Sequence, residues 1–227
     1  MTLEKKQIIR KKIIERYFLD LNFRIENFNS TRKRMDVYLS SDFNVFELIN
    51  PDENKLSDII SDLLDSSGTH AQGDLFLREF LTVANIKKTN TSNYKVVRED
   101  ATTYICHSNR RIDITIDMAT CGIGIENKPW ALDQEDQVRD YQEHLNRKYN
   151  GNFVLVYMSG DGSDPTSIEE EFKKHLLNQK KLIIFKYPDE LIKWLRRCKK
   201  ECESEKYRWF LRDFIQYVET HFSYNVF

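Results

Sequence analysis

The sequence has few of the features that mark secreted, membrane or metal-stapled proteins. Four cysteines are scattered over 227 residues without a Cys-x-x-Cys pair, so the spacing argues against a zinc knuckle and gives no basis for an iron–sulfur cluster. Cys198 and Cys202 lie four apart on a predicted helix; we interpret them as reduced thiols, with a shared metal as the alternative. No apolar run approaches a membrane span and no signal-peptide core follows Met1. We therefore expect a cytoplasmic protein that has no membrane partner.

The composition is that of a globular protein with an uneven distribution of charge. Hydrophobic residues make up 40% of the chain and charged residues 31%, and the length of 227 residues predicts one domain with additions or at most two small domains. Residues 1–40 hold ten Lys or Arg against five acids and residues 180–212 hold eleven against five, whereas residues 41–75 hold one Lys against eight acids. Basic flanks around an acidic centre suit a protein that binds phosphate. Ordinary solvated helix faces are the alternative explanation.

Polar and apolar residues alternate in two consecutive segments near the middle of the chain. Residues 111–117 predict a half-buried strand with an apolar face made of Ile112, Ile114 and Ile116. Asp113 lies on the opposite face, and after a turn near residues 119–120 the next strand places Glu126 and Lys128 on its polar side. A link this short predicts an antiparallel hairpin. The hairpin would bring Asp113 and Glu126 within reach of one cation.

These residue types in this order point to metal-assisted cleavage of phosphodiester bonds. Mg²⁺ prefers oxygen ligands and usually binds protein through only one or two carboxylates, which Asp113 and Glu126 supply. Lys128 leaves the strand on the same side, where it can orient the attacking water and offset charge at a phosphate. The alternative is that the acids simply form the solvated face of a strand.

The rest of the chain reads as a mixed α/β domain without internal repeats or long linkers. Helices are predicted over 3–26, from Pro51-Asp52-Glu53 to Leu64, and over 74–84, 134–149, 166–178, 191–197 and 207–222. Strands are predicted over 94–99, 102–106, 153–158 and 182–186, besides the hairpin. A polar stretch at 27–31 predicts the end of the first helix.

The motif residues resemble those of a known family. Asp113, Glu126-Asn127-Lys128 and the trailing Gln137-x-x-x-Tyr141 are similar to the PD-(D/E)XK nuclease superfamily, particularly the branch of RecB nuclease domains and lambda exonuclease. The resemblance covers roughly residues 52–186, and Ile112 replaces the Pro that often precedes the first Asp. It implies an α/β fold with a restriction-endonuclease-like core, a mixed sheet flanked by helices in the order α, β, β, β, α, β. The expected domains are an N-terminal helical extension (1–50), the nuclease core (51–187) and C-terminal helices packed on the core (188–227).

The resemblance also implies roles for the site residues. Mg²⁺ or Mn²⁺ would be bound by Asp113, Glu126 and the backbone carbonyl of Asn127, while Lys128 assists the water. Glu53 would be the acid that the first core helix supplies; the alternative is a helix N-terminal acid favoured by the helix dipole. Gln137 and Tyr141 correspond to the family's Gln and Tyr, which would steady the site or contact nucleic acid. The alternative is that Gln137 lies on an ordinary helix surface and that Tyr141 is a core aromatic residue.

The expected function is metal-dependent hydrolysis of nucleic acid, with DNA preferred by analogy to the family. The partner is therefore nucleic acid, together with a possible homo-oligomer or protein partner. The alternative is a catalytically silent module that keeps the fold and binds nucleic acid or a protein. It would bind through its basic ends and the aromatic residues of the last helix, Tyr207, Phe210, Phe214 and Tyr217. At this helical spacing, the alternative is that these aromatic residues belong to the core.

Overall fold

The computed structural model describes residues 3–87, 91, 93–105, 109–118, 121–130 and 134–223. Contacts divide the chain into two compact units, Met1–Phe43 and Asn44–Phe227. Among the described residues, none of the helices combines the length and the apolar character needed to cross a membrane. The predicted turn at residues 119–120 and Cys106 lie outside the described residues.

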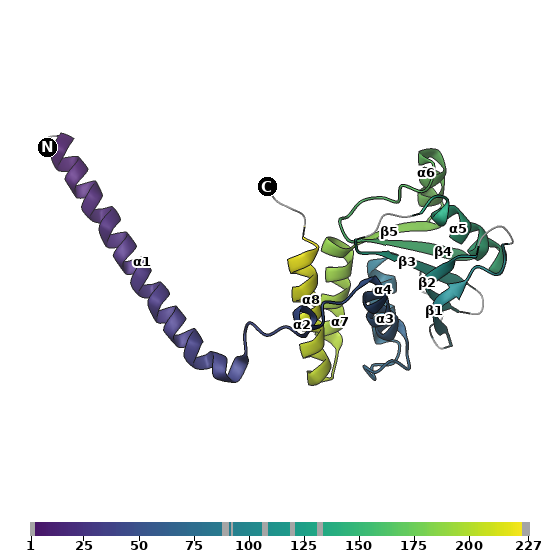
Figure 1. The fold of residues 1–227 in the computed structure, drawn as a ribbon, viewed down its shortest axis with the longest axis horizontal. Helices are drawn as coiled ribbons and strands as arrows, with labels where there is room; N and C mark the ends of the chain where they lie inside the picture. Colours follow the sequence, from purple (N-terminus) through teal and green to yellow (C-terminus); the bar gives the residue numbers. More distant parts are fainter. Residues whose placement is uncertain are drawn as a thin grey trace. The chain divides into compact units, whose positions relative to one another are not determined.

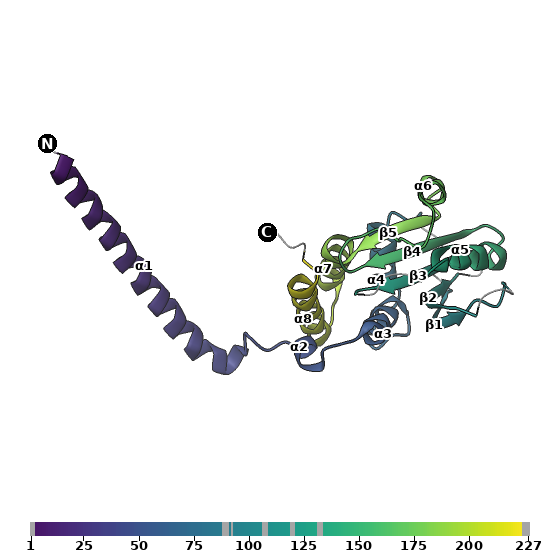
Figure 2. The same cartoon turned by 45° about the horizontal axis from the view of Figure 1, so that its top comes forward.

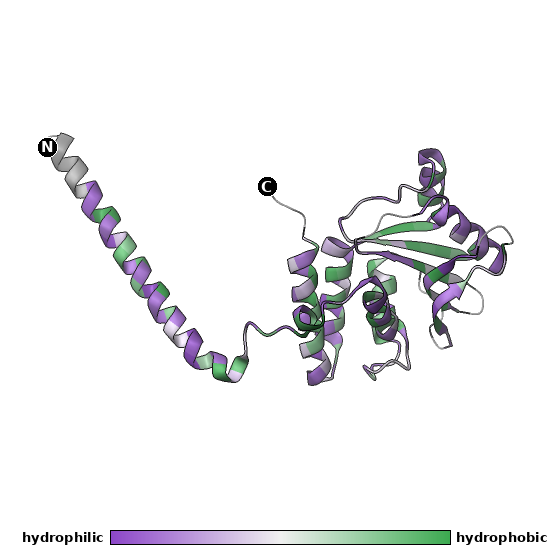
Figure 3. Ribbon diagram, viewed as in Figure 1, coloured by the Kyte–Doolittle hydropathy of each residue, from purple (hydrophilic) through white to green (hydrophobic). Residues whose placement is uncertain are grey.

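The first unit consists of one long helix, α1 (Leu3–Leu39). The helix ending predicted at residues 27–31 is wrong, because α1 runs through this polar stretch without a break. Asn, Ser and Thr cost only a few tenths of a kcal/mol each relative to good helix formers, so a short polar run need not end a helix. Apolar and polar residues alternate around α1 (Figure 3), and large apolar side chains such as Phe28 and Val37 are exposed.

The second unit is built on a five-stranded mixed sheet in the order β1-β2-β3-β4-β5 (Figure 1). The strands are β1 (Lys95–Ala101), β2 (Arg111–Asp117), β3 (Gly122–Lys128), β4 (Phe153–Ser159) and β5 (Leu182–Lys186). The β1, β2 and β3 strands pair antiparallel, as the hairpin prediction required, whereas β3, β4 and β5 pair parallel. The strand predicted over 102–106 is wrong for its described part, where Thr102–Ile105 forms a turn.

Helices cover both faces of this sheet (Figures 1 and 2). Their bounds are α2 (Val45–Ile49), α3 (Glu53–Leu64), α4 (Leu75–Val83), α5 (Gln137–Lys148), α6 (Glu170–Asn178), the short π-helix η1 (Tyr187–Leu191), α7 (Ile192–Glu201) and α8 (Glu205–His221). One core cluster joins α2, α3, α4, α7 and α8 to one face, and a second joins α5 and α6 to the other. The chain therefore has the α/β fold with a restriction-endonuclease-like core that the sequence predicted.

Because both faces are covered, the predicted half-buried β2 strand is buried on both sides, and even Thr115 has no exposed surface. Ile114 and Ile116 pack in the cluster of α3 and α4, as predicted, but Ile112 packs in the cluster of α5. The prediction that Ile112, Ile114 and Ile116 share one face of β2 is therefore wrong for Ile112. Glu99, which lies between the β1 residues paired with Ile112 and Ile114, has a φ of 49°, so the regular pleat is interrupted here.

Two glycines of β3 let helix α5 approach the sheet closely. A Cβ atom at Gly122 would overlap the ring of Tyr149, and one at Gly124 would press on a methyl group of Leu145 at 2.7 Å. Both partners belong to α5 or directly follow it. The glycines therefore fix the helix against the strand that carries Glu126, and α5 is the helix that carries Gln137 and Tyr141.

The aromatic residues of α8 belong to the core. Phe214 and Tyr217 are buried, and Tyr207 and Phe210 are partly buried against the same cluster. Phe46 of α2 stacks on Phe214 with ring centroids 4.8 Å apart. The side chains that a binding module would use as an aromatic grip therefore serve to attach α8 to the rest of the unit.

Candidate active site

The hairpin of β2 and β3 places the predicted acids side by side. Ile114 of β2 lies opposite Ile125 of β3 at the end of the paired segment, and Asp113 and Glu126 are the next residues of the two strands beyond it. The backbone N–H of Asn127 donates to Asp113 Oδ2 at 2.7 Å. Burial raises the pKa of Asp113, and this hydrogen bond, which favours the charged form, opposes the rise.

Glu126 is the most unusual residue of the cluster because its carboxylate is almost completely buried, with 1% of the residue exposed. Its Oε1 accepts hydrogen bonds from Gln137 Nε2 at 2.6 Å and from Lys128 Nζ at 2.8 Å. Its Oε2 is buried and has no hydrogen-bond partner among the described residues. Burial, reinforced by the negative charge of Asp113, raises the pKa of Glu126 to about 8.

Lys128 lies between two carboxylates. Its Nζ is 2.8 Å from Oε1 of Glu126 and 3.0 Å from Oε1 of Glu53, and its side chain is 11% exposed. Burial alone would lower the pKa of Lys128, but the charge and hydrogen bonds of Glu126 and Glu53 outweigh burial and raise it. The ammonium group therefore stays charged and holds Glu53, from the first turn of α3, against the end of β3.

The Gln-x-x-x-Tyr pair forms a short relay from α5 to the hairpin. Gln137 Nε2 contacts Glu126 and also donates to the Tyr141 hydroxyl at 3.0 Å. That hydroxyl in turn donates to the carbonyl oxygen of Arg111 at 2.7 Å, at the start of β2. Adjacent turns of one helix thus hold both strands of the hairpin.

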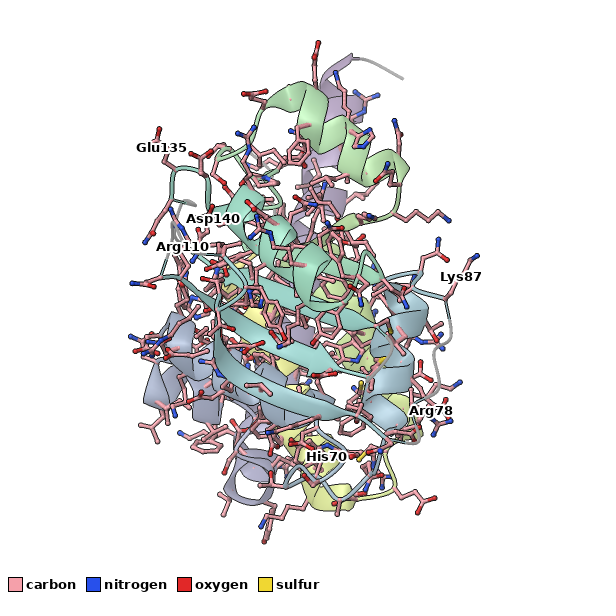
Figure 4. The ribbon with its side chains drawn as sticks, turned by 90° about the vertical axis from the view of Figure 1, so that its right-hand side faces the viewer. His70, Arg78, Lys87, Arg110, Glu135 and Asp140 are labelled. Carbon is pink, nitrogen blue, oxygen red and sulfur yellow. The ribbon has the colours of Figure 1, made fainter. Side chains whose placement is uncertain are left out.

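An ion-paired arginine anchors the start of α5. Arg110 Nε donates to Asp140 Oδ2 at 2.8 Å, and its other nitrogens donate to the side chain of Gln134 and the carbonyl of Glu135. Figure 4 shows Arg110, Glu135 and Asp140 together on one side of the unit. Because Arg110 directly precedes β2, this contact fixes the helix that carries Gln137 relative to the strand that carries Asp113.

Three contacts around the site were not predicted from the sequence. The side chain of Asn127 donates to Ser57 Oγ at 2.9 Å and accepts from the Tyr187 hydroxyl at 2.7 Å. Arg98 of β1 donates to the carbonyl of Asp113. Ser57 follows Glu53 by four residues, a helical spacing that was available as a signal, whereas Tyr187 and Arg98 reach the site only through the folded sheet.

All seven predicted site residues lie in this network: Glu53, Asp113, Glu126, Asn127, Lys128, Gln137 and Tyr141. Within the described part of the chain, no three His, Cys, Asp or Glu side chains are grouped so that they could hold a metal by themselves. Mg²⁺ does not require such a group, because it usually keeps several waters and takes one or two carboxylates. The free, buried Oε2 of Glu126 beside Asp113 fits this hard-cation chemistry.

A comparison with protein families gives an independent assignment. The model of the PD-(D/E)XK nuclease superfamily matches residues 43–216, which is most of the chain. The chain belongs to this superfamily. No match was found among the curated proteins or the solved structures.

Membership in the PD-(D/E)XK superfamily agrees with the fold and with the placement of the motif residues. The matched segment contains the sheet, the helices on its two faces and all seven predicted site residues. It excludes α1, so this helix has to be explained separately. The resemblance seen in the sequence is thus confirmed for the superfamily.

Proposed function

We propose that this protein is a metal-dependent nuclease that hydrolyses phosphodiester bonds in nucleic acid, with DNA as the preferred substrate. The observation that carries the proposal is the buried Glu126 carboxylate, which has one unpartnered oxygen and the Asp113 carboxylate next to it. Burial disfavours the charged form of Glu126, and the neighbouring carboxylate of the partly buried Asp113 adds to this cost, although Lys128 offsets part of it. A site for a divalent cation explains why the chain places these two acids here.

The resident cation would be Mg²⁺ or Mn²⁺, held by Asp113, Glu126 and the backbone carbonyl of Asn127. When bound, it would supply Lewis-acid stabilisation of the charge that develops on the phosphoryl oxygens. Asn127 suits a role as a rigid ligand because Ser57 and Tyr187 fix both ends of its side-chain amide. This second layer of hydrogen bonds would hold the carbonyl in position.

Lys128 is proposed to orient the attacking water and to stabilise negative charge at the phosphate. Its raised pKa means that it keeps its proton, so it acts as a hydrogen-bond donor and a positive charge and does not remove a proton from the water. Glu53 would hold Lys128 in this position through the 3.0 Å contact to its ammonium group.

Gln137 and Tyr141 support assignment to the branch that resembles RecB nuclease domains and lambda exonuclease. Their relay joins Glu126 to the carbonyl of Arg111, which would keep the carboxylate oriented as substrate binds. DNA is the preferred substrate by analogy with that branch. Gln137 is 5% exposed and Tyr141 is 2% exposed, so we propose that they position the site and do not contact nucleic acid.

The expected location and domain division also belong to this proposal. A cytoplasmic location agrees with the free thiols of the described cysteines, which are buried. We propose that residues 1–50 act as a helical extension, 51–187 as the nuclease core and 188–227 as C-terminal helices that stabilise the core. The packing of α7 and α8 against α4 and the sheet supports the last part.

The test is incubation of the purified chain with circular duplex DNA, linear duplex DNA, single-stranded DNA and RNA, each with Mg²⁺, Mn²⁺ or EDTA. The nuclease proposal predicts degradation of at least one DNA in Mg²⁺ or Mn²⁺ and none in EDTA. A gel shift without cleavage in either metal would favour the silent binding module instead. Preferential degradation of RNA would overturn the preference for DNA while keeping the nuclease assignment.

A further inference from the structure

A tryptophan is exposed to solvent directly beside the candidate active site. Trp130 follows Lys128 by two residues, and 55% of its surface is accessible. One side of its indole contacts Phe222, with ring centroids 5.3 Å apart and an interplanar angle of 38°. A single exposed indole needs no explanation by itself, but Trp130 lines the same cavity as Lys128 of the candidate site.

Trp130 forms part of a cavity of about 280 Å³ that also contains Lys128. Other residues in its lining are Ser159, Asp161, His221 and Phe222. Ser159 is the last residue of β4, the strand that pairs with β3, and Asp161 follows it. Ser159 Oγ donates to Asp161 Oδ1 at 2.9 Å. The cavity thus combines the aromatic surface of Trp130, the hydroxyl group of Ser159 and the positively charged residue Lys128.

We propose that this cavity is a nucleobase subsite in which Trp130 stacks on the base of a nucleotide whose phosphate lies at Lys128. The inference rests on the proposed function for the position of that phosphate. A flat aromatic ring accepts any base, because every base has a π-face. A base inside a duplex is already stacked between its neighbours, so the subsite takes unpaired nucleotides, in single strands or frayed ends.

The test measures binding in EDTA by fluorescence anisotropy of labelled oligonucleotides. The probes are an oligothymidylate and an abasic strand of the same length, and the proteins are wild type, Trp130→Ala, Trp130→Phe and Trp209→Ala. Trp209 is the matched control, since it is also exposed, at 46%, but lies on α8 under the guanidinium of Arg212. Trp130→Ala should weaken oligothymidylate binding about tenfold, because a stacked base contributes about 1–3 kcal/mol. Trp130→Phe should lose less, and Trp209→Ala should bind like wild type.

Two results would overturn the subsite: equal affinity of wild type and Trp130→Ala for oligothymidylate, or an equal loss for the abasic strand. The Phe variant keeps an aromatic ring against Phe222, so it separates lost stacking from a lost fold. Failure of the proposed function is a different result, namely no cleavage in any metal. Because binding is measured without metal, the difference in affinity between oligothymidylate and the abasic strand does not depend on whether the protein cleaves nucleic acid.

Helix α1 carries an apolar seam that the nuclease core does not explain. Its residues follow a spacing of four and three: Ile14, Phe18, Leu21, Ile25, Phe28, Met35 and Leu39. Each of these side chains is between 37% and 67% exposed. A repeat of 3.5 residues keeps one stripe facing a partner helix and is typical of a left-handed coiled coil. From Ile14 to Leu39, Arg32 occupies the one core position that is not apolar, and the preceding core position holds Lys11.

We infer that α1 pairs in parallel with α1 of a second copy of this chain. Burying the two seams would remove on the order of 1,000 Å² of surface, which reaches the range of specific interfaces. Asp36 and Asp42 of the same chain already pair with Arg32, so its charge is compensated at the seam. In a parallel pair, Arg10 would face Glu15 of the other helix, an attractive contact between flanking positions.

Two phenylalanines of α1 provide a matched test of this pairing. Phe28 lies in the seam and Phe23 lies outside it, yet their exposures are similar at 67% and 64%. Light scattering of the full chain should give twice the mass of one chain for wild type and Phe23→Glu, and the mass of one chain for Phe28→Glu. A monomeric wild-type protein at tens of micromolar, or equal behaviour of the two variants, would overturn the inference.

Discussion

The unit that carries the candidate site contains two buried clusters of opposite character. Around Phe46, rings of α2 and α8 pack at centroid distances of 4.8 Å to Phe214 and 5.2 Å to Phe210. At the end of β3, ionisable side chains pack instead, and the pKa of Glu126 rises to about 8 because burial disfavours its charge. Burial stabilises the rings and destabilises the acids. The difference separates a cluster that stabilises the fold from the cluster that the proposed chemistry would use.

The largest expected effect is loss of cleavage when the polar cluster is changed. Lys128→Ala and Asp113→Asn should each lower the cleavage rate by about a hundredfold to a thousandfold, because they remove charge stabilisation at the phosphate or a metal ligand. Asn keeps the acceptor that the Asn127 N–H needs, so Asp113→Asn should fold normally. Rates are measured on a labelled DNA in Mn²⁺, with thermal unfolding as the control. Wild-type rates in both variants would contradict these roles.

The aromatic cluster should show the reverse pattern. Phe46 has no exposed surface, so Phe46→Ala should lower the free energy of unfolding by about 3–5 kcal/mol through lost packing and a residual cavity. Phe43→Ala is the control, since Phe43 is 55% exposed and its replacement should change stability by less than about 0.5 kcal/mol. Urea unfolding measures both. The comparison between clusters breaks down if Phe46→Ala is as stable as Phe43→Ala.

A smaller effect on stability and cleavage is expected at Tyr141, which is a buried aromatic residue and also a member of the polar network. Tyr141→Phe keeps the ring but removes the hydroxyl between Gln137 and the carbonyl of Arg111. A lost hydrogen bond of this kind should cost about 1–2 kcal/mol of stability. Cleavage should fall by about tenfold because Glu126 loses part of its orientation. Tyr104→Phe, at a tyrosine that is 49% exposed, is the control for both assays, and equal effects of the two replacements would count against the relay.

A further expected effect is a pH dependence of the stability of the metal-free protein. The pKa of Glu126 rises from 4.5, its ordinary value, to about 8 in the folded protein. Between these two pH values the folded protein therefore keeps a proton on Glu126 that the unfolded chain has released. Stability should therefore be highest below the lower value and fall as pH rises towards about 8. Glu126→Gln should flatten this slope in urea unfolding series. Mn²⁺ binding to wild type, followed by calorimetry, should tighten over the same interval because the cation displaces the proton. A slope that is identical in both proteins would exclude Glu126 as its source.

The sequence predicts structure correctly where the residues that contact one another are also close together in the chain. The alternation around Asp113 and Glu126 predicted the hairpin because antiparallel neighbours with a short link must pair, and the register confirms it. Asp52 followed by Glu53 predicted the start of α3 because Asp52 caps the helix by accepting from the N–H of Lys55. The superfamily follows from the same residues.

Other features depend on contacts that no local pattern records. Ile112 turns to the α5 face where β1 is distorted at Glu99, which alternation could not predict. Tyr187 reaches Asn127 only because η1 follows β5 at the same end of the sheet, sixty residues away in the chain. The polar stretch at residues 27–31 predicts a helix end, but α1 continues through it because weak helix propensities do not suffice to end a helix.

The most direct measurement is the pair of cleavage and stability assays on Glu126→Gln. Gln keeps the shape of the side chain and the oxygen that accepts from Gln137 and Lys128, but it removes the buried charge. If the polar cluster exists for metal-dependent chemistry, the variant without metal is at least as stable as wild type and does not cleave DNA in Mg²⁺ or Mn²⁺. A variant that cleaves at the wild-type rate, or a wild-type chain whose cleavage persists in EDTA, would contradict the account.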